Sequence, residues 1–423
     1  MILSLRYIVK CIFYCFLQRS GRNTPDVIYF IKGAFPSARS NTINKARNIF
    51  RKKGITQEGV IFSFSNKNES YGNYFISSFN ASRKAVIISS LNVLRYALSD
   101  LKLYFHFQLP GRFIYTYLLH SFKSMSLISL NSKVIFGVLE KNYSILIDRY
   151  KKNDQKTCTF SDGLLFYPNI SIKYVHADNY YSTNTISTLA VESDNWSIQH
   201  VKEVGFIGID MKAKSEGVSD DLKQNLSKYS FTVLVALSQV SSNEYYTIDV
   251  KYFEHFFDKI IKIAYNNQDC LFIIKEKKGE LDEISSQFSQ KLSKCSNIFL
   301  VTIDRPHGIE KLTPYSSRYN HFEDLLQEVN LLISLAWEST VIWQALRIKI
   351  PAIAYNDSFD YSFLNQFNYL EVRNKDLEDA FNYWKNIERA DFNKFLNDLD
   401  SKTNILQTDG MKKMLENICT LVT

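Results

Sequence analysis

Short runs of β-branched and aromatic residues alternate along this chain with longer stretches in which apolar residues recur at helical spacing. The first run is DVIYFIKG at 26–33, and the helical pattern NTINKARNIFRKKG follows at 41–54. Parallel strands need long crossover connections, usually helices, so strands that alternate with helical segments indicate βαβ units. The pattern therefore predicts an α/β fold built on parallel sheet.

The alternation is interrupted once, by the polar stretch MKAKSEGVSDDLKQNLSKYS at 211–230. It resumes with predicted strands that start at residues 231, 270, 297, 330 and 350, and the chain closes with helical patterns. A chain of 423 residues is long enough for two cores. We predict a Rossmann-like domain over 1–210, a linker over 211–230, a second Rossmann-like domain over 231–385 and C-terminal helices over 386–423.

The composition is that of a globular protein, with 45% hydrophobic and 22% charged residues. Only 14 glycines and 7 prolines occur, which excludes collagen-like and Pro/Gly-rich disordered chains. The net charge of +8 suits an anionic partner such as a nucleotide, an acidic glycan or a lipid headgroup. The basic residues are spread along the chain, so we predict no nucleic-acid partner.

The six cysteines form no CxxC pair, and none has a histidine at metal-ligand spacing. Scattered cysteines of this kind predict reduced, buried thiols in a cytoplasmic protein. No DxD-type motif lies in a credible loop, because Asp220-Asp221 falls in the linker and the DLD at Asp398 is in a helical pattern. We therefore expect no metal and no bound cofactor.

The N-terminal stretch MILSLRYIVKCIFYCFLQRSGRN is apolar and aromatic but carries basic residues. Its uninterrupted apolar run, 11–17, is far shorter than the roughly 20 residues that span a bilayer. No small-residue cleavage site follows, which argues against a signal peptide. Two interpretations stay open: an amphipathic helix on the membrane surface, and a helix packed on the first domain.

In the second half, candidate binding residues follow three predicted strands at their carboxyl ends, where open parallel sheets bind ligands. Ser339 and Thr340 also precede the helical pattern TVIWQALRI. The free N–H groups and the dipole of a helix N-terminus favour a phosphate there, although such hydroxyls often serve only as N-caps. The candidates are Lys275, Arg305, His307, Glu338, Ser339 and Thr340.

In the first half, several acidic and imidazole side chains could act as a general base. We interpret SDG and VHADNYY as loops after strands, where catalytic side chains commonly lie. Asp178 and His200 rank ahead of Asp162 and His176. Asp162 could instead cap a turn, and His200 could be a core histidine. A bare turn is the simpler interpretation of Gly33, although a glycine there lets a ligand approach the backbone.

The segment LLISLAWESTVIWQALRIKIPAIAYND at 331–357 resembles the donor-site segment of bacterial GT-B glycosyltransferases that build surface polysaccharides. That group shows a strand, a Ser-Ser-Thr or Ser-Thr cluster, a Glu-Ala-Leu helix and Gly-x-Pro before the next strand. Ser339-Thr340, Ala345-Leu346 and Ile350-Pro351 match this pattern. Gln199-His200 match the first two positions of the Gln-His-Gly that ends a strand in the group. The resemblance covers much of 134–357.

Four positions depart from the pattern of the group. Gln344 stands where the helix Glu is usual, Lys349 where Gly is usual, Val201 where Gly follows Gln-His, and Glu276-Lys277 where Pro-His is usual. In many relatives the helix Glu contacts the donor sugar or ribose. Gln344 takes that position here, and Glu338 could serve instead.

The resemblance implies a GT-B fold, with two Rossmann-like domains facing a central cleft. It implies a cytoplasmic glycosyltransferase that moves a sugar from a nucleotide-sugar to a growing capsule or lipopolysaccharide chain or a lipid-linked acceptor, with peripheral contact at the inner membrane. We expect metal-independent, inverting transfer, in which basic and hydroxyl groups stabilise the leaving phosphate. The donor-binding residues would be Lys275, His307, Glu338, Ser339, Thr340 and Gln344, and the catalytic candidates Asp162, Asp178 and His200.

Two alternatives stay open at this point. One is a polyol-phosphate transferase that uses CDP-glycerol or CDP-ribitol, which shares the C-terminal arrangement but usually carries histidine motifs not intact here. The other is a catalytically inactive GT-B scaffold that binds glycan, because fold does not imply function. An epimerase of the same fold has no support from a particular residue.

Overall fold

The structure is a computed structural model of the 423-residue chain. It describes the residues 26–32, 48–62, 132–137, 151, 154–160, 176–193, 197–205, 217–237, 250–275, 291–292, 294–301, 315–316, 322–335, 340–356, 367–373, 376–407 and 409–423. The chain divides into two compact units, each described by itself below. Unit 1 comprises Met1–Ile209 and Gln407–Thr423, and unit 2 comprises Asp210–Leu406.

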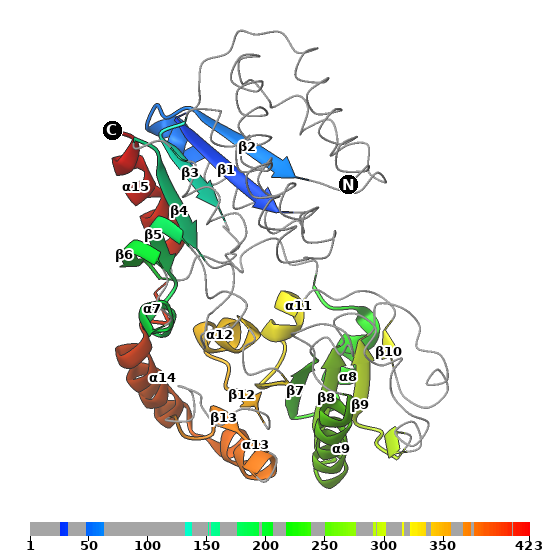
Figure 1. The fold of residues 1–423 in the computed structure, drawn as a ribbon. Coiled ribbons are helices and arrows are strands. Elements are labelled where there is room, and N and C mark those ends of the chain that lie inside the picture. Colours follow the sequence, from blue (N-terminus) through cyan, green and yellow to red (C-terminus); the bar gives the residue numbers. More distant parts are fainter. Residues whose placement is uncertain are drawn as a thin grey trace, which may run out of the picture. The chain divides into compact units, whose positions relative to one another are not determined.

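Unit 1 is built on a parallel sheet whose six described strands lie in the order β2-β1-β3-β4-β5-β6 (Figure 1). Every neighbouring pair is parallel, which confirms the predicted α/β class. Helix α7 (Thr185–Ser193) connects the last two strands. The strands are β1 (Val27–Lys32), β2 (Gln57–Phe62), β3 (Val134–Gly137), β4 (Lys156–Phe160), β5 (His176–Ser182) and β6 (Ser197–Glu203).

The C-terminal helix α15 (Gly410–Val422) belongs to unit 1 and lies along this sheet (Figure 1). Its apolar face shares one buried core with β1, β3 and β4, through Met414, Leu415 and Ile418. The Lys133 ammonium donates a 2.6 Å hydrogen bond to the carbonyl oxygen of Val422 at the end of the helix. The helices that the sequence groups over 386–423 are thus divided between the two units.

Unit 2 holds a second parallel sheet, with its seven described strands in the order β10-β9-β8-β7-β11-β12-β13. Its long strands are buried throughout, as expected for a parallel sheet covered on both faces. The strands are β7 (Phe231–Ala236), β8 (Cys270–Lys275), β9 (Ile298–Val301), β10 (Tyr315–Ser316), β11 (Leu331–Ser334), β12 (Ala352–Tyr355) and β13 (Glu371–Val372). The helices are α8 (Asp220–Leu226), α9 (Val250–Asn266), α11 (Phe322–Gln327), α12 (Thr340–Arg347), α13 (Leu377–Asn386) and α14 (Arg389–Thr403).

The segment 211–230, predicted as a linker from its polarity, contains helix α8. Val218 and Leu222 are buried and attach it to unit 2. Asp220 and Asp221 lie in the first turn, where the helix dipole favours negative charge. The stretch predicted as a linker from its polarity therefore carries a short helix with a buried side chain.

The strand order of unit 2 changes direction at β7. The chain runs from β7 outward through β8, β9 and β10, and then returns to place β11 on the other side of β7. Ligands of open α/β sheets bind at such a switch point, outside the carboxyl ends of the strands. The carboxyl ends of β7 and β11 are therefore the place in unit 2 to look for a site.

Helix α12 ends in a turn that requires a left-handed residue. Lys349 has φ 63°, and its N–H donates to the carbonyl of Leu346 at 3.0 Å. The N–H of Ile350 donates to the carbonyl of Ala345 at 2.9 Å, which completes a Schellman motif. Glycine is favoured at this position because it has no Cβ. This explains why the related transferase segment carries Gly where this chain carries Lys349.

We expect Lys349→Gly to raise the free energy of unfolding by roughly 0.5–1 kcal/mol, since glycine relieves the left-handed strain but adds entropy to the unfolded chain. The side chain of Lys349 is exposed, so its loss changes little else. Urea denaturation followed by circular dichroism measures the difference. Lys349→Ala is the control, because it removes the lysine but keeps the strain. Equal stability of the glycine and alanine variants would contradict the explanation.

Among the described helices, none is both long and apolar enough to cross a membrane. The N-terminal segment 1–25, for which a membrane-surface helix is one interpretation, lies outside the described residues. The four described cysteines are free and buried: Cys158, Cys270, Cys295 and Cys419. Burial raises the pKa of the Cys158 thiol to about 12, so that side chain is a core group and not a nucleophile.

Candidate functional site

One register row crosses the sheet of unit 2 at its carboxyl edge. Ala236 of β7 pairs with Lys275 of β8 on one side and with Ser334 of β11 on the other. Ser334 pairs in turn with Ala354 of β12. Residues in register on parallel strands point to the same face, so these four side chains line one face of the sheet. Lys275 and Ser334 are two strand spacings apart, or about 10 Å.

The row coincides with the switch point between β7 and β11. Lys275, only 7% exposed, puts a positive charge at this edge, and Ser334 adds a buried hydroxyl. Ala236 lies between these two residues in the row and Ala354 lies on the other side of Ser334, and both side chains are small. The arrangement suits a ligand with negatively charged oxygens that lies across the strand ends.

Helix α12 begins at the same edge. It follows β11 and packs against β11 and β12, so its N-terminus faces the carboxyl ends of the strands and its C-terminus the amino ends. Ile342, Trp343 and Leu346 are fully buried and hold it in place. Its N-terminal N–H groups and dipole add positive potential beside Lys275.

Two predicted donor-binding residues lie on this helix. Thr340 is its first residue, and Gln344 is four residues later. Residues four apart share a helix face, so Gln344 lies one turn from the N-terminus on the same side as Thr340. The strand–helix–strand arrangement predicted for 332–357 is confirmed by β11, α12 and β12. His307, Glu338 and Ser339, with Arg305, lie outside the described residues.

Sequence reasoning missed two polar residues at this edge, Ser334 and Asn356. Asn356 directly follows β12, is fully buried, and donates a 2.7 Å hydrogen bond from Nδ2 to the Glu371 carboxylate. The available signal was positional, since each polar residue ends or directly follows an apolar strand.

In unit 1, the interpretation of His176 and Asp178 as loop residues was wrong. Both lie in β5, at its first and third positions, near the amino end of the sheet. Ligand sites of parallel sheets lie at the opposite edge. Asp178 is buried, and its carboxylate accepts two 2.8 Å hydrogen bonds from the Lys151 ammonium. The backbone N–H and the hydroxyl of Thr157 donate to the same carboxylate at 2.7 and 2.9 Å.

These contacts make Asp178 a stably ionised group. Burial alone would raise the pKa of its carboxyl, but hydrogen bonds from Lys151 and Thr157, with the lysine charge, outweigh it and hold the pKa below the ordinary 3.8. A general base works best with a pKa near the working pH. The geometry therefore favours a structural role for Asp178 over the catalytic role proposed from the sequence.

His200 lies in the middle of β6, and not at the strand end where the Gln-His-Gly pattern that this segment resembles would place it. The strand continues to Glu203, three residues or about 10 Å further. His200 is exposed on this edge strand, which excludes the interpretation as a core histidine. Glu203, and not His200, occupies the carboxyl end. Asp162, the third candidate base, lies outside the described residues.

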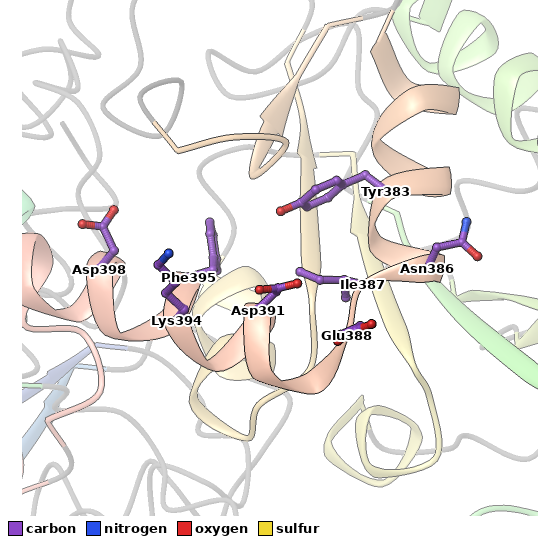
Figure 2. Close-up of a pocket in the computed structure, with 8 residues that line it drawn as sticks. All are labelled: Tyr383, Asn386, Ile387, Glu388, Asp391, Lys394, Phe395 and Asp398. Carbon is purple, nitrogen blue, oxygen red and sulfur yellow. The ribbon is translucent and has the colours of Figure 1, made fainter.

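A pocket of about 660 Å³ lies at the junction of α13 and α14 (Figure 2). Figure 2 shows Tyr383 from α13 and Asp391 and Lys394 from α14 bordering the same space. The lining carries three carboxylates and one ammonium, so its net charge is unfavourable for phosphate. The lining residues are Tyr383, Asn386, Ile387, Glu388, Asp391, Lys394, Phe395 and Asp398.

A second pocket, of about 380 Å³, lies at the amino ends of β7, β11 and β12. It has an apolar floor that includes Trp384 and Phe392, and the cations Lys349, Lys385 and Arg389 border it. Lys385 is already paired with Asp269 at 2.8 Å. This pocket has the charge that phosphate requires but lies at the edge where parallel sheets rarely bind ligands. This pocket is the alternative phosphate site that a binding experiment must exclude.

Among the described residues, no group of three His, Cys, Asp or Glu side chains could hold a metal ion. Lys275 and Gln344 present an ammonium and an amide. Groups of this kind bind phosphate and ribose directly and are poor ligands for Mg²⁺ or Mn²⁺. The site as described is therefore a candidate for direct binding of an anion.

The chain is similar in structure to several proteins that bind or form UDP compounds. A trehalose-phosphate synthase (UDP-forming) from Burkholderia vietnamiensis has a TM-score of 0.54 at 9% identity, with 95% of this chain and 99% of that chain covered. A UDP-GlcNAc 2-epimerase from Neisseria meningitidis bound to UDP-GlcNAc has a TM-score of 0.52 at 12% identity, covering 93% and 99%. The S. aureus MnaA–UDP structure has a TM-score of 0.50 at 8% identity, covering 93% and 95%.

The sequence matches no protein-family model. No curated protein is a significant sequence match. At identities near 10% the structural likeness concerns the fold alone. It confirms the predicted fold class, an α/β protein of the GT-B type with two parallel sheets and C-terminal helices.

Proposed function

We propose that this protein is a glycosyltransferase that binds a nucleotide-sugar at the carboxyl edge of unit 2. The observation that carries the proposal is the convergence of Lys275, Ser334 and the α12 N-terminus at the β7–β11 switch point. The Ser339-Thr340 motif, which resembles the donor segment of surface-polysaccharide transferases, leads into the same helix. The fold likeness to proteins that bind or form UDP compounds supports a nucleotide ligand.

In the proposed reaction, an acceptor hydroxyl attacks the anomeric carbon of the donor sugar, and the nucleotide leaves as a phosphate anion. The negative charge that develops on the leaving oxygens needs stabilisation. Lys275, the hydroxyl of Thr340 and the dipole of α12 would supply it without a metal, together with Ser339 and His307. Gln344 would contact the sugar or ribose where relatives have Glu. Charge neutralisation by side chains and a helix dipole is an established route in phosphate chemistry.

The acceptor side is proposed from the sequence resemblance, which supports a growing surface polysaccharide or a lipid-linked acceptor at the inner membrane. A base from unit 1 would remove the proton of the attacking hydroxyl. Of the candidates, His200 and Asp162 are retained. Asp178 is set aside because its carboxylate is fully engaged at the amino edge.

We expect one nucleotide family to raise the unfolding temperature of the full chain, because a ligand that binds only the native state stabilises it by mass action. The panel is CMP, CDP, UDP and GDP, each at about 1 mM, with their common sugar or glycerol conjugates. At a hundred times its Kd, a nucleotide adds about 2.7 kcal/mol and shifts the midpoint by several degrees. Ser339→Ala/Thr340→Ala should reduce the shift, since it removes two hydroxyls from the phosphate end of α12.

Three outcomes would count against the proposal. If no nucleotide raises the unfolding temperature, the proposed donor site is rejected and the inactive glycan-binding scaffold remains. A shift that is unchanged in Ser339→Ala/Thr340→Ala places the nucleotide elsewhere. A shift with CDP-glycerol and with no nucleotide-sugar makes the protein a polyol-phosphate transferase. Ser401→Ala/Thr403→Ala on α14 is the control for loss of two hydroxyls in the same unit.

A further inference from the structure

The junction between β5 and α7 is lined by polar side chains that the proposed donor site does not use. It lies at the carboxyl edge of the sheet in unit 1. Four of the side chains are at most 4% exposed, which is unusual for a turn. The sequence STNTIST at 182–188 predicts only a loop before a helix. The polar residues are Ser182, Thr183, Asn184, Thr185, Ser187 and Thr188.

The buried hydroxyls satisfy one another. Ser182 Oγ donates to the carbonyl oxygen of Asn184 at 2.6 Å. Thr188 Oγ1 donates to Ser182 Oγ at 2.8 Å, and the hydroxyls of Thr183 and Ser187 are 3.2 Å apart. Buried polar groups are normally paired in this way. The hydroxyls therefore form a fixed scaffold and do not by themselves indicate a ligand.

Asn184 is the exception. Its Oδ1 accepts a 2.7 Å hydrogen bond from the backbone N–H of Ser187, so the side chain caps α7. That bond fixes the orientation of the amide, because only the oxygen can accept from an N–H. Nδ2 is then turned away from the helix backbone. It is fully buried and has no hydrogen-bond partner among the described residues.

An unsatisfied buried NH₂ group is costly to the fold, and native proteins keep few of them. This one lies at the N-terminus of a nine-residue helix and at the carboxyl end of a parallel strand. Both are places where proteins bind ligands. The donor on Nδ2 therefore marks a binding position for an oxygen acceptor.

The charge at the junction decides which kind of oxygen is suitable. Glu203, at the carboxyl end of β6, accepts a hydrogen bond from Thr185 Oγ1 at 3.2 Å, and Thr188 Oγ1 lies 3.5 Å from its other oxygen. Its carboxylate lies at the N-terminus of α7, where the helix dipole favours a negative charge. A phosphate or carboxylate ligand would be repelled there. A neutral hydroxyl can accept from Nδ2 and can donate to a carboxylate.

We propose that Asn184 and Glu203 form a subsite for the hydroxyl groups of a neutral sugar. An amide donor and a carboxylate acceptor at the same strand–helix junction match a hydroxyl, or two neighbouring hydroxyls, on one ring. The identification of this sugar as the glycosyl acceptor rests on the proposed function. Binding of the sugar does not require the nucleotide-sugar.

The test is saturation-transfer NMR on the full chain without nucleotide. The probes are the methyl glycosides of glucose, galactose, rhamnose, N-acetylglucosamine and N-acetylgalactosamine, with methyl glucuronide as the anionic comparison. We expect at least one neutral glycoside to bind and the glucuronide to bind more weakly. Asn184→Asp and Asn184→Ser both keep an N-cap oxygen but lack the NH₂ group. Each should weaken binding of the neutral glycoside about tenfold.

Two further variants separate binding from folding. Glu203→Gln removes the charge at nearly constant size, so the preference for neutral over anionic glycoside should fall. Asn48→Asp, at an exposed helical position of unit 1, is the control for the charge change of Asn184→Asp and should leave glycoside binding unchanged. The unfolding temperature of Asn184→Ser should stay within a few degrees of the wild type, because serine caps a helix about as well as asparagine.

The proposal is overturned if no neutral glycoside binds, if the glucuronide binds more tightly than the neutral glycosides, or if both Asn184 variants bind like the wild type. Nucleotide binding is measured on the same samples. Nucleotide binding without an effect of Asn184 rejects the subsite alone. Glycoside binding that depends on Asn184, in a protein that binds no nucleotide, supports the subsite and rejects the proposed transferase.

Discussion

Asp178→Ala is expected to lower the free energy of unfolding by about 3 kcal/mol, because it removes the carboxylate that accepts two hydrogen bonds from the half-buried Lys151 ammonium. Lys151 is 14% exposed and Asp178 is 5% exposed at their side chains, so water offers the lysine only partial compensation. The change also removes the acceptor of two Thr157 hydrogen bonds. Urea denaturation followed by circular dichroism measures the loss.

The same ion pair predicts a pH dependence. The pKa of Asp178 in the folded chain lies below its ordinary 3.8, so the folded state favours the ionised form. Its stabilisation is fully present above about pH 4 and is lost as the pH falls through the lower, folded pKa. The stability difference between wild type and Asp178→Asn should therefore be constant from pH 5 to 7 and shrink below pH 4.

Asp154→Asn is the matched control, since Asp154 is exposed and lies two residues before β4. It should change stability by less than about 0.5 kcal/mol. Thr157→Val provides an independent test, because it disturbs the same network without touching a carboxylate. If Asp178→Asn kept full stability and lost only turnover, the structural role would be wrong and the catalytic role restored.

Lys275→Met is expected to weaken nucleotide binding by roughly 10- to 100-fold. A charge-assisted hydrogen bond to phosphate contributes about 1.5–3 kcal/mol, and methionine keeps much of the length and apolar stem of the lysine. Isothermal titration of the best nucleotide from the thermal screen gives both affinities.

The control for Lys275→Met is Arg389→Met, which removes a cation from the pocket at the amino ends of the strands. The two variants lose the same charge in the same unit. If Arg389→Met weakened the nucleotide and Lys275→Met did not, the ligand would bind at the amino edge. The proposed donor site would then be wrong, although the fold would be unaffected.

The elements of unit 2 were predictable because its strands are short, continuous apolar runs. The runs at 270–275 and 331–334 are buried on both faces, and such strands need no alternation to be recognised. Helix α9 shows strong apolar periodicity, which is the sequence signal of an amphipathic helix. Helix α8 was missed because its segment has two buried apolar residues among those described, Val218 and Leu222. Two apolar positions are too few to establish a helical period.

The site was predictable only in part, because its geometry depends on strand register. Lys275 was found from its place at a strand end. Nothing in the sequence puts it in register with Ser334, which is 59 residues away along the chain and two strands away across the sheet. The error at Asp178 has a different cause. Polar residues inside β5 look like loop residues when the buried hydrogen bonds that satisfy them are not foreseen.

The most direct test of the central claim is release of nucleotide from a nucleotide-sugar, followed by mass spectrometry. The purified chain is incubated with CMP-, UDP- and GDP-sugars, with and without a mixture of simple glycosides as acceptors. The account predicts that one donor releases its nucleotide, that an acceptor speeds the release, and that Lys275→Met slows it at least tenfold. Conversion of the sugar without release of nucleotide would indicate an epimerase. No reaction with any donor, in a protein that binds none of them, would contradict the account.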